Sequence, residues 1–555
     1  MKTVMAATAL LALHAGGVAA DCAWTVSPTD EVPPTTRLAA ADDWRAGAPR
    51  LTGPAVFGAT PGRRFVQAFP VCGSRDDLGF ALAGELPQGV AFDSRRGVLS
   101  GRAAAGEYRL RVTATNRLGR CSREVLFKVG DNCRALTPPM GWTSWNACMC
   151  TVDSTRIRKE AQALVDTGLA AHGWTYVNCD AGWSEDVGRP GVRRSPGPVK
   201  PNPAFADMAD LVRDIHALGL KAGVYSSPMI YTWGSEGRHV FVGTGDCPVD
   251  RTYRLAYVPF GAETNGIGSV QRMREDAAQW AAWGFDWLKY DWCSTTADLG
   301  SRMRAALDAT GRDIVLQLCT ACRPSESNAL ARAAELVRGN DDVTDVWTGA
   351  KGLAAIARKL DAWTGYSRPG RWYDLDMLAI GRMMIYRKTD GLELRPGEPL
   401  PGDARFDNRL TREEQILHFA YWAFAPAPLF LSCELVGLDG LVRDLASNDG
   451  LIAVNQDALG APADFRDIDG VRVGSRPLSE GGRAWGAFNF ADAPRRVTLK
   501  VDAAWKIVDA FTGRAPAEPS DAGTALSFVL PPHGARVFTG AADGRQSKRK
   551  VLQLP

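Results

Sequence analysis

The chain has 555 residues, of which 45% are hydrophobic and 23% charged, and its formal net charge is +3. These proportions are those of a globular protein rather than a disordered one, and the length predicts more than one core. So small a charge on so long a chain gives no field that would favour binding to nucleic acid or to a membrane surface.

Residues 1–20 have the pattern of a secretory signal peptide. Lys2 precedes an apolar run from Val4 to Leu13, too short to span a bilayer, and small residues end the segment at Ala20. This pattern predicts an exported protein, either secreted or periplasmic. The sequence contains no Asn-x-Ser/Thr sequon, which favours a bacterial origin. All 12 cysteines follow this segment, which predicts disulfides of open connectivity.

Two segments precede the longest regular region. Residues 21–50 are rich in Pro, Thr, Ala and Asp without a period, which predicts a linker or loosely packed arm. Residues 51–131 contain short strands separated by turn residues, typical of an immunoglobulin-like β-sandwich. Its segments 86–93 and 97–101 resemble the immunoglobulin-like modules of secreted bacterial hydrolases. The module has no paired catalytic residues, so we expect an accessory role, and we favour a spacer over a sugar-binding module.

Strand and helix patterns alternate over residues 137–460. One strand ends at Asp180, a helix follows Asn202-Pro203, and the apolar run 285–290 ends directly before Asp291. Alternation of this kind predicts a parallel sheet, and the length suits a (β/α)8 TIM barrel better than an open doubly wound sheet.

The remaining residues return to β patterns. Residues 461–540 alternate as strands and predict an antiparallel β-sandwich, whereas the basic residues 541–555 predict a disordered tail. The predicted fold is therefore multidomain, with a TIM barrel between an N-terminal immunoglobulin-like β-sandwich and a C-terminal β-sandwich.

Several functional classes have no site in this sequence. No glycine-rich phosphate loop opens a helix, and Gly-x-Ser-x-Gly is absent, so nucleotide-binding and common esterase sites are not predicted. The five histidines after residue 20 lack metal-ligand spacing, and we predict no metal and no cofactor. Cys319 and Cys322 have redox spacing without a thioredoxin pattern, and we predict no redox role.

Charged residues recur at the predicted strand ends. Because catalytic groups of a β/α barrel lie at the carboxyl ends of its strands, Asp291 and Asp342 form a candidate pair. Two carboxylates flanking a glycosidic bond are the minimum for its hydrolysis. Lys289 is expected to keep Asp291 ionised, while burial and the charge of Asp291 are expected to keep a proton on Asp342. The alternative is that Asp341 and Asp342 belong to a solvated loop and have no catalytic role.

Six motifs occur in an order that identifies a resemblance. Together they are similar to the α-galactosidases and α-N-acetylgalactosaminidases of glycoside hydrolase family 27, over about residues 137–540. The resemblance implies a (β/α)8 barrel and retention of anomeric configuration. The motifs are Pro139–Asn146, Lys289–Asp291, Arg338 with Asp342 and Trp347, Asp374–Leu378, Ala427–Phe430 and Asn455–Gly460.

The same resemblance implies a role for each matching residue. It makes Asp291 the nucleophile and Asp342 the acid/base. A disulfide at the rim of the site is implied for Cys247 and Cys293. The implied substrate-binding residues are Asp180, Lys289 and Arg338 as hydroxyl contacts, Trp142 and Trp145 as an aromatic wall, and Tyr225 and Asp376 as support.

Two departures leave the sugar open. The family's Asp-Asp pair after the second strand appears here as Asp180-Ala181, and the loop 319–326 does not match the family's loop for the 2-substituent. The site has lost one side chain that would hydrogen-bond a sugar hydroxyl, and this weakens its discrimination between sugars. Galactosides, N-acetylgalactosaminides, β-L-arabinopyranosides and α-glucosides therefore all remain candidate substrates. Residues 228–268 form an enlarged third βα loop that is expected to lie over the site.

The leading hypothesis is a secreted, retaining exo-α-galactosidase or a close relative. Retention predicts that the two carboxyl groups lie about 5 to 5.5 Å apart. The expected partner is a carbohydrate substrate, not nucleic acid or membrane, and a homodimer remains open. A non-catalytic carbohydrate-binding protein on a degenerate barrel is the alternative, against which both carboxylates argue.

Overall fold

In the computed structural model, the described residues are 22–185, 198–228, 231–233, 239–241, 272–291, 297–319, 322–384, 406–501, 505–516 and 525–542. The predicted signal peptide, the pair Cys247 and Cys293, and the tail after residue 542 lie outside these ranges. Among the described helices, none combines the length and apolar character that crossing a membrane requires.

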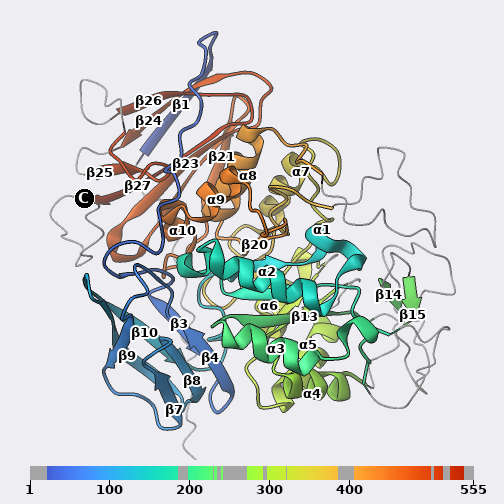
Figure 1. The fold of residues 1–555 in the computed structure, drawn as a ribbon. Helices are drawn as coiled ribbons and strands as arrows, with labels where there is room; N and C mark the ends of the chain where they lie inside the picture. Colours follow the sequence, from blue (N-terminus) through green and yellow to red (C-terminus); the bar gives the residue numbers. More distant parts are fainter. Residues whose placement is uncertain are drawn as a thin grey trace, which may run out of the picture.

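The central domain is a closed parallel barrel, as the sequence predicts (Figure 1). Each of the first six barrel strands pairs with the next barrel strand in the chain, and the eighth pairs with the first. The Leu378 amide donates to the Phe430 carbonyl over 2.8 Å and closes the remaining gap beside β19. The strands are β11 (Met140–Thr143), β12 (Tyr176–Cys179), β13 (Lys221–Ser226), β16 (Trp287–Tyr290), β17 (Val315–Leu318), β18 (Leu336–Val337), β19 (Trp372–Tyr373) and β20 (Leu429–Leu431).

Helices cover the barrel between successive strands. In α3, the predicted stripe of Met208, Leu211, Val212 and Ile215 is buried. A capping box of Thr411 and Glu414 starts α8, which is buried on almost every side because it lies between the barrel and the C-terminal domain. The helices are α1 (Trp145–Cys148), α2 (Ser154–Asp166), α3 (Met208–Ala217), α4 (Met273–Trp283), α5 (Ala297–Ala309), α6 (Ser327–Ala333), α7 (Leu353–Arg358), α8 (Arg412–Phe424), α9 (Gly440–Ala446) and α10 (Asp449–Asn455). The third loop carries a hairpin of β14 (Tyr231–Trp233) and β15 (His239–Phe241).

The N-terminal module is a small β-sandwich with a hydrophobic core of its own. Its strand β9 alternates buried and exposed side chains, as the period of two predicts. One sheet holds β3 (Val56–Ala59), β10 (Gly119–Val129), β9 (Gly106–Asn116) and β6 (Gly79–Ala83). The other holds β4 (Arg64–Ala68), β8 (Val98–Arg102) and β7 (Val90–Asp93), and β2 (Arg50–Leu51) pairs with β5 (Val71–Cys72).

The C-terminal domain consists of two antiparallel sheets, and its inner side chains join the core of the barrel. The larger sheet holds β21 (Asp464–Ile468), β22 (Val471–Pro477), β23 (Arg483–Asn489), β27 (Ala535–Ala542) and β25 (Trp505–Asp509). The smaller holds β24 (Arg495–Val501), β26 (Ala525–Leu530) and a strand from the other end of the chain, β1 (Cys22–Pro28).

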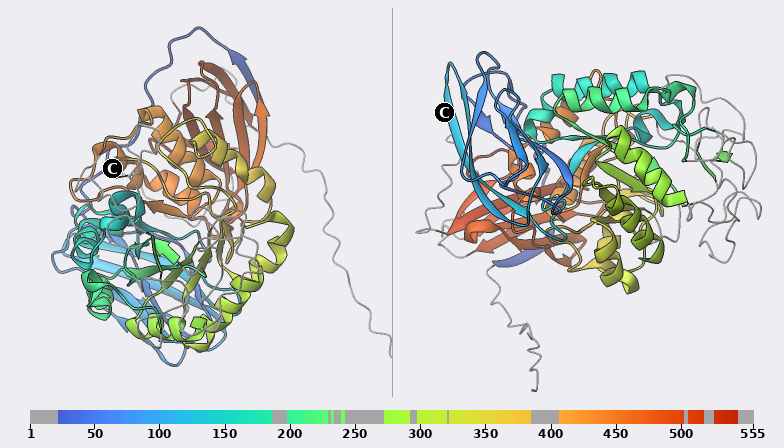
Figure 2. Two further views of the ribbon diagram at one scale, coloured as in Figure 1. Left: turned by 90° about the vertical axis from the view of Figure 1, so that its right-hand side faces the viewer. Right: turned by 90° about the horizontal axis from the view of Figure 1, so that it is seen from below.

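The prediction of a linker or loosely packed arm over residues 21–50 is wrong for β1. This strand pairs antiparallel with β24 along its whole length, and Figures 1 and 2 show it beside the C-terminal strands. Its side chains Trp24 and Val26 pack against the cores of that domain. The alternation covers only Cys22, Trp24 and Val26 before prolines begin, so the partner sheet, not the local pattern, decides the structure.

The module is fixed to the amino-terminal end of the barrel. The amide of Arg64 in β4 donates to the Gly311 carbonyl, and the Asp313 amide donates back to the Arg64 carbonyl, both over 2.9 Å. Arg134, in the segment between module and barrel, forms ion pairs with Asp308, Asp313 and Glu335. The module is therefore held by backbone pairing and buried charge rather than by a free linker.

A buried carboxylate at the same end of the barrel has a structural role. Asp286, just before β16, accepts from His216 Nε2 at 2.8 Å and from the Ala222 amide at 3.0 Å, and it forms an ion pair with Arg312. Although burial acts against it, Arg312 and His216 lower the pKa of Asp286 to about 2. Asp286 thus ties three segments together at the end of the barrel that serves stability.

We predict that Arg134→Ala destabilises the fold by roughly 3–5 kcal/mol, because it removes the ion pair of the buried Asp313 and leaves the buried Glu335 with Arg304 as its remaining cation. The measurement is the free energy of unfolding from denaturant titration. Arg111→Ala is the matched control, since its pair with Glu124 is exposed and worth no more than about 1 kcal/mol. Equal losses in the two variants would contradict the structural role of Arg134.

Candidate active site

Asp291 lies at the carboxyl end of β16, where the sequence predicts it. Its amide donates to the Ser226 carbonyl over 2.9 Å, which fixes the backbone against β13. Lys289, two residues earlier, lies on the same face of the strand, with its Nζ 3.8 Å from Asp291 Oδ2 and 2.8 Å from Asp180 Oδ2. One lysine therefore joins the carboxylates that follow β12 and β16.

Both carboxylate oxygens of Asp180 accept hydrogen bonds, although its side chain is only 2% exposed. Its Oδ2 accepts from Thr143 Oγ1 at 3.3 Å, its Oδ1 accepts from the Ala181 amide at 2.8 Å, and its own amide donates to Ser144 Oγ. The buried Tyr225 ring lies under Lys289, with Nζ 5.7 Å from the ring centroid. Tyr225 therefore supports the lysine, in line with its predicted role.

Arg338 joins a second pair of carboxylates after β18 and β19. Its Nη2 lies 2.9 Å from Asp342 Oδ1 and its Nη1 lies 2.5 Å from Asp376 Oδ2, while its own side chain is buried. Asp376 Oδ2 also accepts from the Val343 amide at 2.8 Å. Asp376 therefore lies behind the arginine and orients both Arg338 and the residue after Asp342.

The backbone of Asp376 is held in an uncommon conformation. Its φ of +82° lies in the left-handed region, which costs free energy for a residue with a side chain. Its amide donates to Asp374 Oδ1 at 2.8 Å, and its carbonyl accepts from Trp422 Nε1 at 2.9 Å. These bonds offset the strain and aim the carboxylate at Arg338.

The charges in the ligand-free site shift the two candidate catalytic carboxyls in opposite directions. Burial raises the pKa of Asp291, and repulsion from Asp342 adds to this against the attraction of Lys289. Although burial opposes the change, Arg338 and then Lys351 hold the pKa of Asp342 below its usual range. Lys351 Nζ lies 3.4 Å from Asp342 Oδ2.

The pKa of Asp291 is thus raised and that of Asp342 lowered, whereas we expected from the sequence that Asp342 would hold the proton. The physical reason is that Asp342 is 49% exposed and contacts two cations, whereas Asp291 is 14% exposed. Lys351 follows Asp342 by nine residues, and only the fold of the loop shows that it returns to it. Burial, joined by Asp342 and Asp374, also raises the pKa of Asp376 to about 6 against the attraction of Arg338.

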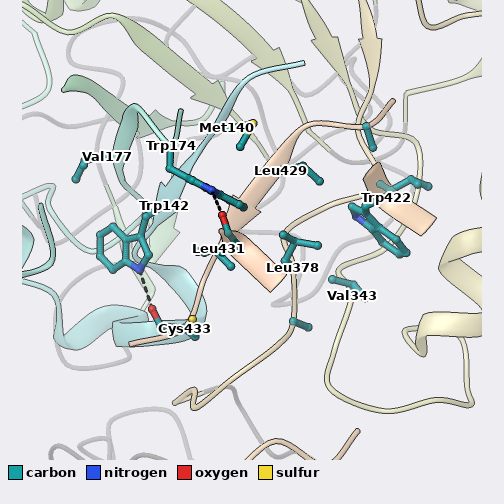
Figure 3. Close-up of a cluster of buried hydrophobic side chains, with 14 of the residues drawn as sticks. Met140, Trp142, Trp174, Val177, Val343, Leu378, Trp422, Leu429, Leu431 and Cys433 are labelled. Atoms are coloured by element: carbon teal, nitrogen blue, oxygen red, sulfur yellow. Dashed lines mark hydrogen bonds between the residues drawn. The ribbon is translucent and has the colours of Figure 1, made fainter. Parts of the chain in front are cut away.

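The prediction that Trp142 forms part of an aromatic wall is wrong. Its indole is fully buried in the core of the barrel, and its Nε1 donates to the Cys433 carbonyl over 2.8 Å (Figure 3). Trp145 begins α1 just beyond the strand end and is partly exposed, so it remains a candidate for sugar contact. The sequence shows two tryptophans three residues apart but not where β11 ends.

The expected disulfides are not found among seven of the described cysteines, which carry free thiols. They are Cys72, Cys121, Cys133, Cys148, Cys179, Cys319 and Cys433. Within the described ranges, no group of three or more His, Cys, Asp or Glu side chains is placed to hold a metal ion.

The structure adds two residues that the sequence-based list of site residues lacks. Lys351 contacts Asp342, and Asp374 supports the backbone of Asp376 and accepts a hydrogen bond from Gln317 of β17. Asp374 lies in the same short motif as Asp376, which was a usable signal. No local pattern singles out Lys351 among the other lysines.

Comparisons with known proteins agree with this geometry. A family model described as alpha galactosidase A matches residues 255–391, and a model of an Ig domain matches residues 48–129. Alpha-galactosidase 2 of Arabidopsis thaliana is 30% identical over 377 residues, which are 67% of this chain and 80% of that relative.

Solved structures extend the similarity to the fold. Alpha-galactosidase I from Mortierella vinacea has a TM-score of 0.58 at 25% identity, over 75% of this chain and 99% of that one. A Bacteroides fragilis structure has a TM-score of 0.73 at 26% identity, over 90% and 99% of the two chains. A β-L-arabinopyranosidase from Geobacillus stearothermophilus, 23% identical with a TM-score of 0.59 over 73% and 97%, shares the fold. The chain belongs to the α-galactosidase family, glycoside hydrolase family 27, and is a glycoside hydrolase.

Proposed function

We propose that this chain is a secreted, retaining exo-glycosidase that removes terminal α-D-galactosyl residues. The observation that supports it is the joining of four carboxylates by two buried cations at the carboxyl ends of the barrel strands. Repulsion from Asp342 contributes to the raised pKa of Asp291, which supports the proposal that the two carboxyls face the same bond.

The proposed reaction is a double displacement. Asp291 attacks C1 of the sugar while Asp342 transfers its proton to the leaving oxygen, so the glycosidic bond breaks as a glycosyl ester forms. Asp342 then removes a proton from water, the resulting hydroxide attacks C1, and the ester bond to Asp291 breaks. The sugar leaves with its original configuration, and both carboxyls return to their starting states.

The charges around the pair limit how much of the free enzyme is ready to react. The reacting form needs Asp291 ionised and Asp342 protonated, yet Arg338 and Lys351 favour the opposite distribution. In the ligand-free enzyme the charges therefore favour a proton on Asp291 over a proton on Asp342. A change that weakens the positive field at Asp342 should favour its protonated form.

The substitution at Ala181 bears on which sugar the site accepts. Ala181 is 1% exposed and supplies no side-chain hydrogen bond where the family has a second carboxylate. Its small side chain leaves Asp180 as the one acidic side chain of the Asp180-Ala181 pair. Galactosides are favoured by the curated relatives, and the similarity to an arabinopyranosidase keeps that sugar in the comparison.

We predict that Asp291→Asn abolishes turnover of an activated galactoside, and that Asp342→Asn lowers kcat about 10²- to 10⁴-fold, the range of a lost general acid/base. Asp341→Asn is the matched control, because this neighbouring side chain is exposed. Steady-state hydrolysis of nitrophenyl α-galactoside is the measurement. Wild-type turnover by either of the first two variants would refute the roles assigned to them.

We predict that Lys351→Met moves the acidic limb of the kcat/KM profile to higher pH, because Asp342 is the carboxyl of the pair with the lower pKa. Removing a positive charge from beside Asp342 raises the pKa of that carboxyl, so its proton is kept to higher pH. The shift should stay below about one pH unit, since exposed ion pairs are worth about 0.2–1 kcal/mol. A shift to lower pH would contradict this account.

A panel of glycosides decides the sugar. We expect nitrophenyl α-galactoside to have a higher kcat/KM than the α-N-acetylgalactosaminide, β-L-arabinopyranoside and α-glucoside analogues. The reason is the family's preference together with the retained contacts at Asp180, Lys289 and Arg338. A higher kcat/KM for the arabinopyranoside would show that Ala181 has changed the specificity, and binding without turnover of any of them would favour a carbohydrate-binding protein.

A further inference from the structure

The loop that carries Asp342 is folded back on itself. The Thr344 amide donates to the Lys351 carbonyl over 2.9 Å, and the Leu353 amide donates to the Val346 carbonyl over 2.8 Å. The returning limb places Lys351 beside Asp342. Trp347 lies at the far end of this loop, where its partly buried ring packs against the main core.

A histidine from the C-terminal domain stacks on that tryptophan. The rings of His533 and Trp347 have centroids 3.8 Å apart and an interplanar angle of 21°. Phe490, from the same domain, also stacks on Trp347, at 5.6 Å and 28°. The end of the loop is thus held by the rings of Phe490 and His533, which lie about 150 and about 190 residues after Asp342 in the sequence.

The orientation of His533 is fixed from both ring nitrogens. Nδ1 lies 2.7 Å from Glu414 Oε1 and Nε2 lies 2.9 Å from Asp492 Oδ1. Glu414 accepts at the same time from the Thr411 amide at 2.7 Å, so the histidine is joined to the capped start of α8. Burial opposes the change, but both carboxylates raise the pKa of His533 and favour its charged form.

From this chain of contacts we propose that His533 is a positioning residue for the acid/base carboxyl. Its stack on Trp347 fixes the loop, and the loop fixes Asp342 and Lys351 relative to Arg338. This proposal rests on the proposed function, because it gives the C-terminal domain a part in proton transfer to the leaving group. His533 itself touches no reacting atom.

The proposal has a chemical consequence that a structural role lacks. Proton transfer matters most for a leaving group that is a poor anion, such as an alkoxide, and least for dinitrophenolate. If the loop moves, hydrolysis of an alkyl glycoside should slow more than hydrolysis of the dinitrophenyl glycoside. A loss of folded protein would lower both rates by the same factor.

The test compares His533→Ala with His533→Phe, which keeps a ring to stack on Trp347. For His533→Ala we expect kcat/KM on the methyl glycoside to fall about tenfold or more, in the range that small misplacements cost. On the dinitrophenyl glycoside kcat/KM, which covers only the step that releases the leaving group, should fall less than about threefold. His533→Phe should retain most of the wild-type ratio between the two substrates.

Phe528→Ala is the control for stability, because Phe528 packs against the Phe538 ring in the C-terminal domain and has no ring contact with Trp347 among the described residues. It should lower Tm without changing the ratio of the two kcat/KM values. Equal losses on both substrates in His533→Ala, or no loss, would overturn the positioning role. Both test substrates carry the sugar that the wild type hydrolyses in the glycoside panel. If the wild type hydrolyses none of those glycosides, the proposed function is refuted instead.

Discussion

Two buried cations determine the geometry of this site. A lysine or arginine removed from water is tolerated only when carboxylates compensate its charge. Lys289 meets this need with Asp180 and Asp291, and Arg338 meets it with Asp342 and Asp376. Because the four acids follow four different strands, satisfying two cations brings the ends of β12, β16, β18 and β19 into one arrangement.

The two ends of the barrel use the same kind of interaction for different purposes. At the amino-terminal end, Asp286 and Arg134 are nearly sealed from water and hold strands, helices and the N-terminal module together. At the carboxyl end, Asp291 and Asp342 keep some exposure, so that a ligand can reach them. The C-terminal domain continues the core of the barrel and contacts the Asp342 loop, while the module keeps a core of its own.

Periodic patterns predicted most of the fold, because strand and helix periods are local properties of the chain. The parallel barrel and the position of Asp291 after an apolar run follow from them. The strand β1 could not be predicted, since three alternating apolar residues become a strand only through pairing with β24.

The electrostatics of the site depended on contacts that no local pattern contains. Lys289 and Asp291 share a face by spacing alone, and this pair was predicted. The effect of Lys351 on Asp342 depends on the return of a loop, and the sequence-based proton placement was wrong for that reason. The predicted role of Trp142 was wrong because the sequence does not show where β11 ends, and a tryptophan inside that strand points into the core.

The central claim is that Asp291 is the group that becomes covalently attached to the sugar. The most direct measurement is mass spectrometry of peptides after the enzyme is incubated with a fluorinated galactosyl donor that forms the glycosyl ester but slows its hydrolysis. The account predicts one added sugar on the peptide that contains Asp291 and none on that enzyme once Asp291 is replaced by Asn. A label on the peptide that contains Asp342, or turnover with inversion and no label, would contradict it.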